Sequence, residues 1–443
     1  MLSIYGYRLN KDDIDESSIL SKLTVKPNDD FMGHQTETDS EFCVCLETKK
    51  YIYVPKFYGL QTYGIPASSM LPEPVSVSFD FVGNLMECQK EPIEVFMNAA
   101  DEPAKMGGIL QLPPGFGKTV MALYIISMLR KRTLVIVHKE FLMNQWKERI
   151  HQYLPTATIG VIKQKRFEID NDIVIASLQT ICSRDYDAKL LSSFGFVIID
   201  ECHHIGAKIF SRALSKINFR YTLGLSATVT RKDGLSKVFK WFIGDVLYKI
   251  SSKETKVTTE VDIHKFKCND KNYNRECFIS TGKLNIARMI TNVCECVERN
   301  IYIASVVNNM LKYEPTRNII LLSERRQHLI DLSNYFDKNI FGFYVGGMKS
   351  AELEVTKTKR LILGTFNMVS EGFDLPKLDT LILATSKSDI EQSVGRIQRK
   401  HEYTEADNTP RIIDIVDMFS LFARQASKRM QFYKKKKYDF VKL

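Results

Sequence analysis

The sequence predicts an α/β protein in which a small β-rich N-terminal domain precedes two domains built on parallel sheets. Between residues 105 and 250, and again between 313 and 443, short apolar runs alternate with longer segments of helical period. Apolar strands that alternate with helices are typical of parallel sheets covered by helices on both faces. A chain of 443 residues has room for about three such units, at about 150 residues per domain.

The first 80 residues differ from the rest because they are polar and rich in aromatic residues. The stretch CVCLETKKYIYVPKFYGL (43–60) contains strand-forming residues, with the lysine pair at 49–50 as a turn. Three prolines between residues 66 and 74 then indicate a linker. We expect an accessory domain over residues 1–80. It either binds DNA or a partner, or only packs on the domain that follows.

The first α/β pattern occupies residues 81–250. Its strands are short runs rich in Ile, Val and Leu, and its helices show the apolar period of about 3.6 residues. The expected strands are 109–112, 133–138, 172–177, 196–200 and 221–228, and the expected helices are 119–131 and 140–153. Trp146 lies within the second of these helices, which is amphipathic, and we expect its ring to be part of the core.

Residues 251–312 are expected to connect the two α/β domains, because 251–280 is polar and without a clear period and 284–312 is helical. The second α/β pattern, with the basic tail, is expected over 313–443. Its expected strands are 318–323, 342–347, 360–365, 380–385 and 411–417. The tail FYKKKKYDF (432–440) mixes lysines with aromatic residues, so it either contacts phosphates and stacks on bases or forms a solvated chain end.

Composition limits the class of protein. Lys and Arg total 62 and Asp and Glu total 52, which gives a formal charge of +10 and fits a polyanionic partner. The sequence has no uncharged apolar stretch of about 18 residues and no signal-peptide pattern. Nine scattered cysteines suggest reduced thiols in a soluble intracellular protein. The C-x-C pairs at 43–45 and 294–296 lack zinc-ribbon spacing, so we expect them in the core.

The segment LPPGFGKT (112–119) lies between an expected strand and an expected helix. Backbone N–H groups of a glycine-rich turn at a helix N-terminus bind phosphate oxygens. The lysine is suited to pair with the β- and γ-phosphates of ATP, and the threonine hydroxyl to ligate Mg²⁺. A leucine stands where the general pattern has its first glycine. The expected ATP-binding residues of the loop are Pro114, Gly115, Phe116, Gly117, Lys118 and Thr119.

The segment FVIIDECHH (196–204) is an apolar strand that ends in two adjacent carboxylates. Such a pair is costly to place at the end of a buried strand unless a cation or a reaction needs it. We expect Asp200 to hold Mg²⁺ and Glu201 to polarise the water that attacks the nucleotide. The alternative is an exposed acidic turn.

The segment QSVGRIQR (392–399) places Arg396 and Arg399 three residues apart, on one face of a helix. Arginines of this kind stabilise the charge of a transferring phosphoryl group, with effects of about 10³–10⁵ in rate. A solvated basic helix face is the alternative for this motif alone. All three motifs in this order arise by chance in on the order of one chain in 10⁵, which favours one functional reading for the set.

With these motifs the chain resembles the superfamily 2 helicases of the DExH type, over about residues 85–430. Thr180, after ASLQ, is similar to motif Ib of that family. Ser226-Ala227-Thr228 is similar to the motif that couples the ATP site to nucleic acid. The segments GT (364–365) and EGFD (371–374) are similar to motif V.

Other segments resemble one branch of that family. Arg231-Lys232-Asp233-Gly234 is similar to the XPB-like DNA translocases. YVPKFYG (53–59) and EQSVGRIQRK (391–400) resemble XPB-like helicases of phages and large DNA viruses, and the plan is similar to that of a poxvirus transcript-release helicase. Gln89 stands where the family has a glutamine that reads adenine.

The resemblance implies two RecA-like domains with ATP and Mg²⁺ at their interface. The catalytic residues would then be Glu201, Gln392, Arg396 and Arg399. The residues that couple ATP to movement would be His203, Ser226, Thr228, Gly372 and Asp374. The nucleic-acid contacts would be Lys139, Asn144, Gln145, Thr180, Arg231 and Thr365, which suit phosphate and sugar and not base edges.

The sequence therefore predicts an ATP-dependent DNA translocase or helicase that acts in transcription or repair. An RNA helicase is one alternative. A second is an ATP-gated clamp that remodels a partner and translocates without separating strands. RNA polymerase and repair proteins are the candidate protein partners. If the source is a virus, we expect the protein in the infected-cell cytoplasm and in the virion.

Overall fold

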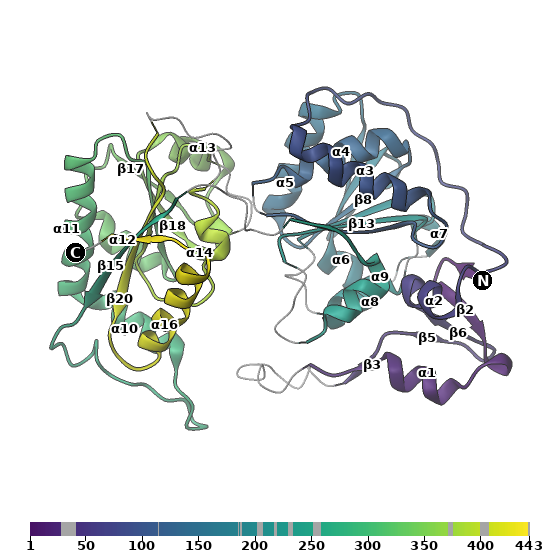
Figure 1. Cartoon of the computed structure of the whole chain (residues 1–443), viewed down its shortest axis with the longest axis horizontal. Helices are drawn as coiled ribbons and strands as arrows, with labels where there is room; N and C mark the ends of the chain where they lie inside the picture. Colours follow the sequence, from purple (N-terminus) through teal and green to yellow (C-terminus); the bar gives the residue numbers. More distant parts are fainter. Residues whose placement is uncertain are drawn as a thin grey trace. The chain divides into compact units, whose positions relative to one another are not determined.

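The computed structural model describes residues 1–27, 41–113, 115–184, 186, 188–201, 207–216, 219–228, 234–250, 258–370, 375–398 and 407–441. The chain divides into two compact units, Met1–Ser251 and Ser252–Leu443 (Figure 1). Each unit contains one large sheet, and the first unit also contains the N-terminal accessory module. The two units are described separately.

In the described residues, the accessory module consists of a four-stranded antiparallel sheet, a short strand pair, two α-helices and one 3-10 helix. The sheet order is β1-β2-β6-β5, and β3 pairs with β4. The strands are β1 (Leu2–Ser3), β2 (Gly6–Asn10), β3 (Thr24–Val25), β4 (Phe42–Cys43), β5 (Leu46–Glu47) and β6 (Tyr51–Val54). The helices are η1 (Lys11–Asp13), α1 (Glu16–Leu23) and α2 (Lys56–Tyr63). The turn expected at 49–50 joins β5 and β6.

The first large sheet has the order β10-β9-β11-β8-β12-β13-β7-β14, and β10 is antiparallel to its neighbour β9 while the other pairs are parallel. Its strands are β7 (Gly107–Gln111), β8 (Thr133–Val137), β9 (Ile159–Lys163), β10 (Arg166–Phe167), β11 (Ile173–Ser177), β12 (Phe196–Asp200), β13 (Tyr221–Ser226) and β14 (Val246–Lys249). Since the strands are parallel, the residues that follow β7, β8, β11, β12 and β13 meet at one edge.

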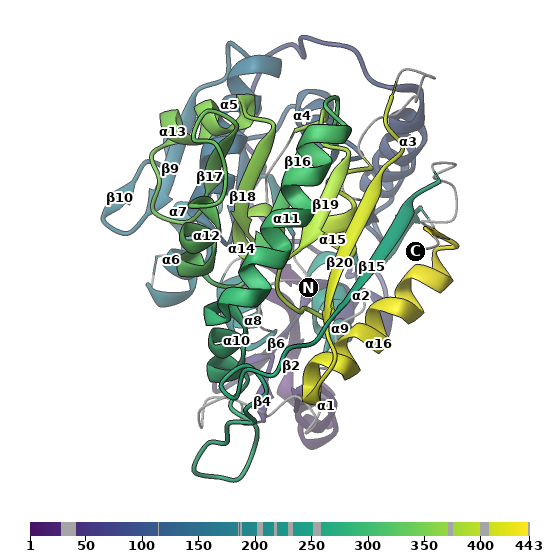
Figure 2. The ribbon, with the colours of Figure 1, turned by 90° about the vertical axis from the view of Figure 1, so that its left-hand side faces the viewer.

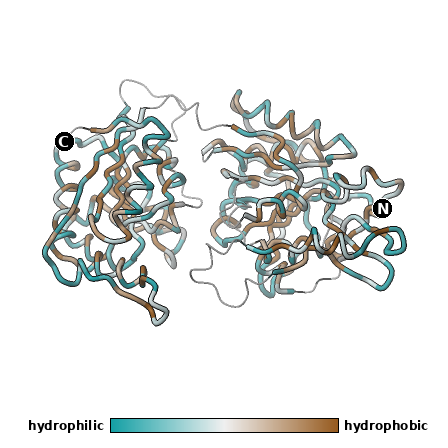
Figure 3. Tube along the Cα trace, turned by 60° about the horizontal axis from the view of Figure 1, so that its bottom comes forward, coloured by the Kyte–Doolittle hydropathy of each residue, from teal (hydrophilic) through white to brown (hydrophobic). Residues whose placement is uncertain are grey.

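Helices cover both faces of this sheet, as the apolar strands predict. On one face lie α3 (Glu87–Asp101), α4 (Lys118–Leu129) and α5 (Glu140–Tyr153) (Figure 1). On the other lie α6 (Leu178–Ser183), α8 (Ala207–Leu214) and α9 (Ser236–Ile243), and α7 (Ala188–Leu191) is a short helix near the sheet. The hydropathy colouring shows apolar segments gathered along the strands (Figure 3). Trp146 on α5 is buried in this core, which confirms its expected place.

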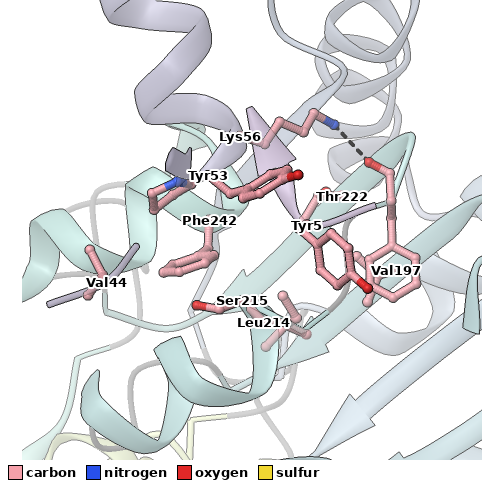
Figure 4. Close-up of a pocket in the computed structure, with 13 residues that line it drawn as sticks. Tyr5, Val44, Tyr53, Lys56, Val197, Leu214, Ser215, Thr222 and Phe242 are labelled. Atoms are coloured by element: carbon pink, nitrogen blue, oxygen red, sulfur yellow. Dashed lines mark hydrogen bonds between the residues drawn. The ribbon is translucent and has the colours of Figure 1, made fainter. Parts of the chain in front are cut away.

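The accessory module packs on the face of the first sheet that carries α8 and α9. The ring of Tyr58 on α2 meets that of Trp241 on α9 edge-on, with centroids 5.6 Å apart. Lys56, at the start of α2, is buried (Figure 4). Its Nζ donates hydrogen bonds to the carbonyl oxygens of Phe219 at 3.0 Å and Arg220 at 2.7 Å. The contact surrounds a cavity of about 20 Å³. Burial, with the nearby Arg220 charge, lowers the pKa of Lys56 to about 7.

The second unit contains a seven-stranded parallel sheet of order β17-β18-β16-β19-β20-β15-β21 (Figure 2). Its strands are β15 (Glu260–Phe266), β16 (Ile319–Ser323), β17 (Phe341–Tyr344), β18 (Leu361–Thr365), β19 (Thr380–Leu383), β20 (Arg411–Asp417) and β21 (Asp439–Phe440). Its helices are α10 (Ile286–Glu295), α11 (Val297–Tyr313), α12 (Arg326–Ser333), α13 (Ser350–Thr358), α14 (Phe366–Ser370), α15 (Glu391–Val394) and α16 (Ser420–Lys435).

The interpretation of residues 251–280 as a connector is wrong for β15. This strand pairs with β20 along its whole length, and Glu260 forms an ion pair with Arg411 across the pair at 2.7 Å. Its side chains are largely half-buried, so its sequence lacks the apolar run that identifies an interior strand. The expected helical region 284–312 forms α10 and α11.

One aromatic residue of the C-terminal tail is not available for stacking on bases. Tyr433 is buried in the core of the second unit, and β21 adds the tail to the sheet beside β15. The tail is therefore not a frayed end either. The cysteine prediction holds for Cys294 and Cys296, which are buried, and is wrong for Cys43, which is exposed because β4 is a short outer strand.

Two negative observations apply to the described residues. None of their helices is long and apolar enough to cross a membrane. Within the same part of the chain, no three His, Cys, Asp or Glu side chains gather in a way that could hold a metal ion.

Candidate active site

The segment that carries the predicted phosphate-binding motif connects β7 to α4. Gly115 and Gly117 have φ values of +83° and +78°, in the left-handed region that glycine adopts without strain. A Cβ atom on Gly117 would lie 2.3 Å from the side-chain nitrogen of Gln89. Position 117 therefore has no room for a side chain.

Gln89 holds this loop against the start of α3. Its side chain is 2% exposed. Its Oε1 accepts a hydrogen bond from the backbone N–H of Met86, and its Nε2 donates one to the carbonyl oxygen of Phe116, both at 3.0 Å. The structure thus shows Gln89 supporting the loop, and its expected contact with adenine stays a prediction.

Lys118 begins α4, directly after the loop. Its Nζ lies 3.5 Å from Oε1 of Glu201 and donates a weak hydrogen bond to the carbonyl oxygen of Leu112 at 3.4 Å. Lys118 comes from the end of β7 and Glu201 from the end of β12, two strands away in the sheet. The two sequence motifs of this unit, out of three in the chain, therefore meet at its carboxyl edge, as the parallel order requires.

Asp200 is the last residue of β12 and its side chain is buried. The indole N–H of Trp146 donates a hydrogen bond to its Oδ2 at 2.8 Å. Burial, together with the adjacent Glu201 carboxylate, raises the pKa of Asp200 to about 6. Glu201 itself has a φ of +48°, uncommon for a residue other than glycine, so the backbone turns sharply where the two carboxylates follow one another.

The residues at this edge fit a Mg²⁺–nucleotide. The hydroxyl of Thr119, at the start of α4, and the carboxylate of Asp200 supply the oxygen ligands that Mg²⁺ takes. A buried carboxylate with a raised pKa beside a second carboxylate gains most from a cation. The N-terminus of α4 offers N–H donors to phosphate.

The expected coupling segment is hydrogen-bonded to the end of β7. The hydroxyl of Ser226 donates to the carbonyl oxygen of Thr228 and accepts from its N–H at 3.2 Å, which forms a tight turn. The backbone N–H of Leu112 donates to the carbonyl oxygen of Ser226 at 2.9 Å. The amide of Gln111 reaches the carbonyl oxygen of Ala227 at 3.5 Å. Hydrogen bonds therefore connect the end of β7 to Ser226 and Ala227.

The expected nucleic-acid contacts of the first unit lie near the start of α5 and on α6. Lys139 is the N-cap residue of α5, Asn144 is exposed on that helix, and Gln145 is half-buried. Thr180 differs from the expectation: it is 6% exposed, and its hydroxyl oxygen accepts a hydrogen bond from the N–H of Gln164 at 3.1 Å. Because this hydroxyl lies inside the protein, Thr180 supports the chain around Gln164.

The third motif lies in the second unit. Gln392 is half-buried on α15, and Arg396 follows the helix with a side chain that is largely buried. Thr365, a predicted nucleic-acid contact, is the last residue of β18 and is half-buried.

Two buried arginines hold the chain that leads into α15. Arg299 on α11 forms a bidentate pair with Asp417 at 2.7 and 3.0 Å and donates to the carbonyl oxygen of Ala384 at 2.8 Å. Arg429 on α16 pairs with Asp414 and donates to the carbonyl oxygen of Lys387 at 2.9 Å. Sequence reasoning missed both, because a single arginine in a helix carries no signal of a buried partner.

Several predicted site residues lie outside the described part of the chain and stay predictions. They are Pro114, His203, Arg231, Gly372, Asp374 and Arg399.

The fold of the chain is similar to solved helicase structures. Saccharomyces cerevisiae Dbp5, bound to RNA and ADP BeF3, matches with a TM-score of 0.55 over 80% of this chain and 89% of that chain, at 11% sequence identity. At this identity the likeness concerns the fold alone. Both large sheets thus belong to RecA-like domains of the kind found in superfamily 2 helicases.

Sequence comparisons then identify the family. Residues 83–231 match the family model described as "Type III restriction enzyme, res subunit". A protein of Acanthamoeba polyphaga mimivirus, named as an ATP-dependent RNA helicase, is 32% identical over 99% of this chain and 86% of its own length. A protein of Invertebrate iridescent virus 6, named as a helicase, is 30% identical over 72% of this chain and 74% of its own.

A third relative is cellular. A protein of Sulfurisphaera tokodaii, named as a DNA 3'-5' translocase of the XPB type, is 33% identical over 156 residues, which are 33% of each chain. The chain belongs to the superfamily 2 helicases of viral type, a family of enzymes that hydrolyse ATP.

Proposed function

We propose that the chain is a DNA-stimulated translocase or helicase that binds ATP at the carboxyl edge of its first sheet. The observation that carries this proposal is the meeting of Lys118, Asp200 and Glu201 beside the N-terminus of α4. Two carboxylates and one lysine at a glycine-rich turn form the charge pattern that phosphoryl transfer from ATP requires.

Each of these side chains has a separate task in hydrolysis. The ammonium group of Lys118 pairs with the β- and γ-phosphates of the substrate, which replaces its present contact with Glu201. Glu201 is then able to orient and polarise the attacking water. When bound, Mg²⁺ neutralises charge on the phosphates, and Thr119 and Asp200 would hold it.

The second unit supplies positive charge to the transition state in this proposal. Gln392, Arg396 and Arg399 match the family motif that contacts the transferring phosphoryl group. An arginine in this role contributes about 10³–10⁵ in rate. Movement is coupled to hydrolysis through Ser226 and Thr228, with His203, Gly372 and Asp374 as further coupling residues.

DNA is the favoured nucleic acid. Its support is the Arg231-Lys232-Asp233-Gly234 segment, together with the similarity to an archaeal protein named as a DNA translocase. The name of the mimivirus relative favours RNA as the alternative. We further propose a role in transcription or repair, with RNA polymerase or repair proteins as partners.

The test is ATP hydrolysis by the full chain alone, with duplex DNA, with single-stranded DNA and with RNA. Glu201→Gln is the catalytic control, and Lys118→Ala should abolish turnover because the phosphates lose their cationic partner. Stimulation by duplex DNA that disappears in Glu201→Gln supports the proposal. Stimulation by RNA alone supports the alternative, and turnover that survives Lys118→Ala contradicts the site.

A second assay separates a helicase from an ATP-gated clamp. Displacement of a third strand from a DNA triplex reports translocation, and release of a strand from a forked duplex reports unwinding. Triplex displacement without fork unwinding identifies a translocase that does not separate strands. Arg399→Ala should retain nucleotide affinity and lose hydrolysis, because its charge acts in the transition state.

A further inference from the structure

Two cysteine thiols of the accessory module lie in contact with one another. The Sγ atoms of Cys43 and Cys45 are 3.0 Å apart. Cys43 is the last residue of β4 and is exposed, and Cys45 is half-buried directly before β5. The two sulfur atoms would need to move about 1 Å closer to reach the length of a disulfide bond, about 2.0 Å. Neither thiol belongs to the proposed ATP site or to the predicted nucleic-acid contacts.

The local sequence explains why the two thiols meet. Side chains at positions i and i+2 of an extended chain lie on one face, and the residue between them points to the other. That residue, Val44, is buried, and its backbone N–H donates a hydrogen bond to the carbonyl oxygen of Leu23 at 3.1 Å. Val44 therefore anchors the segment, and its neighbours on either side place their thiols together.

Val44 also connects the pair to the contact between the accessory module and the first sheet. Its side chain lines the cavity at that contact, together with Val197 and Ile199 of β12 (Figure 4). A bond between Cys43 and Cys45 would close a small ring that includes Val44, and such a ring restricts the backbone inside it. Oxidation of the pair would therefore act on the backbone of a residue at this contact.

The environment of the pair favours one thiolate. The hydrogen bond with the Cys45 thiol lowers the pKa of Cys43 to about 6, although partial burial and the Glu47 carboxylate oppose this effect. The same hydrogen bond raises the pKa of Cys45, because a donor to an anion is harder to ionise. At pH 7 about 90% of Cys43 is then thiolate, the form that attacks a disulfide. An exposed nucleophile thus has a second thiol in contact with it.

We propose that Cys43 and Cys45 form a reversible dithiol–disulfide site whose oxidant is a small-molecule disulfide such as oxidised glutathione. The site is independent of the proposed function. Because Cys43 is exposed, the bond is expected to be one of the labile kind that ordinary thiols reduce.

The reaction proceeds in two exchanges. The Cys43 thiolate attacks one sulfur of the oxidant, a mixed disulfide forms, and the broken S–S bond releases one thiolate. The hydrogen bond that raised the pKa of Cys45 is then gone, and Cys45 gives its proton to the released thiolate. Its sulfur attacks the Cys43 sulfur and displaces the second thiolate. The protein loses two electrons, and the oxidant gains them as one thiol and one thiolate.

A second pair of thiols in the chain offers a comparison. The Sγ atoms of Cys268 and Cys296 are 3.7 Å apart. Cys296 is buried, and burial raises its pKa to about 11. At pH 7 its thiolate is scarce, and this scarcity outweighs the greater nucleophilicity of a more basic thiolate. As an attacking thiol, Cys296 is therefore expected to be about 30-fold slower than Cys43.

The test is exposure of the reduced full chain to oxidised glutathione at pH 7, followed by blocking of free thiols and mass spectrometry of the tryptic peptides. Cys43 and Cys45 lie in one tryptic peptide, 23–49. With the disulfide formed, this peptide is lighter by two hydrogen atoms and takes up no blocking reagent. We expect this bond to form at least about tenfold faster than one between Cys268 and Cys296, and reduced glutathione should reverse it.

Single variants separate the two exchanges. Cys45→Ser should stop at a mixed disulfide between glutathione and Cys43, because the second attacking thiol is missing. Cys43→Ser should lose the disulfide and most of the mixed disulfide, because the exposed thiolate is missing. Cys88→Ser is the matched control, since it removes another exposed thiol, and it should leave the product and its rate unchanged.

Three results would overturn the proposal. The first is a wild-type peptide 23–49 that stays reduced or carries only mixed disulfides with glutathione. The second is a bond from Cys43 or Cys45 to another cysteine or another chain. The third is a Cys43–Cys45 bond that forms no faster than the bond between Cys268 and Cys296.

Discussion

Trp146→Phe tests which groups set the pKa of Asp200, the buried carboxylate at the end of β12. The indole N–H is the donor to Asp200 at 2.8 Å, and both side chains are buried. Phenylalanine retains most of the ring packing but has no donor. The substitution therefore removes one hydrogen bond to a carboxylate and leaves the rest of the site in place.

The magnitude follows from the strength of that bond. A hydrogen bond to a charged group contributes about 1.5–3 kcal/mol, which corresponds to a change in pKa of about one to two. The pKa of Asp200, raised to about 6 in the wild type, is then expected at about 7–8 in the variant. At pH 7 the ionised fraction falls from about 90% to between about 50% and 10%, and the apparent Mg²⁺ affinity falls about two- to tenfold with it.

The assay is ATP hydrolysis as a function of free Mg²⁺, at pH 7 and at pH 9. The defect should be clear at pH 7 and small at pH 9, where Asp200 is ionised in both proteins. Trp241→Phe is the matched control, because it removes the same ring portion from α9 and should leave the Mg²⁺ dependence unchanged. A Trp146→Phe variant that is folded and keeps the wild-type Mg²⁺ dependence at pH 7 refutes the reasoning.

Three further predictions concern other buried groups. Lys56→Met removes an ammonium whose pKa is lowered to about 7 from an ordinary 10.5. The folded state loses that proton first as pH rises, so the free energy of unfolding of the wild type, measured in urea, should rise relative to that of the variant by about 2 kcal/mol between pH 7 and 9. Burial lowers the pKa of His328 to about 3, so the unfolded chain binds the proton first on acidification. Wild-type stability should then fall by about 2 kcal/mol from pH 7 to pH 5, and His328→Asn should lack this part of the fall. Gly117→Ala places a Cβ 2.3 Å from the Gln89 amide at a φ of +78°, so nucleotide affinity should fall at least about tenfold; wild-type affinity contradicts the loop geometry.

The apolar strands of both sheets could be read from the sequence because their burial leaves a continuous pattern. The expected helix 140–153 coincides with α5, and the expected strands 196–200 and 411–417 coincide with β12 and β20. The apolar residues of each of these elements are buried in the core. The apolar pattern in the sequence therefore matches the burial of these residues in the structure.

Other elements carried no such pattern. β15 is a mostly polar strand that is defined by its pairing with β20 and by the Glu260–Arg411 ion pair. The hairpin of β9 and β10 has a tip of charged residues, and its turn is stabilised by Thr180, sixteen residues away. Neither partner is visible in a local window, because the stabilising groups come from elsewhere in the chain.

The sequence by itself determined the residue types of the proposed ATP site. Glycines, a lysine and two carboxylates at fixed spacing after apolar strands are local features, and parallel strands bring their ends to one edge. Only the tertiary structure decided which groups support that chemistry. Trp146 reaches Asp200 across 54 residues, and Thr180 holds a basic hairpin and does not face a ligand. These roles depend on distances in space, which the order of residues along the chain does not contain.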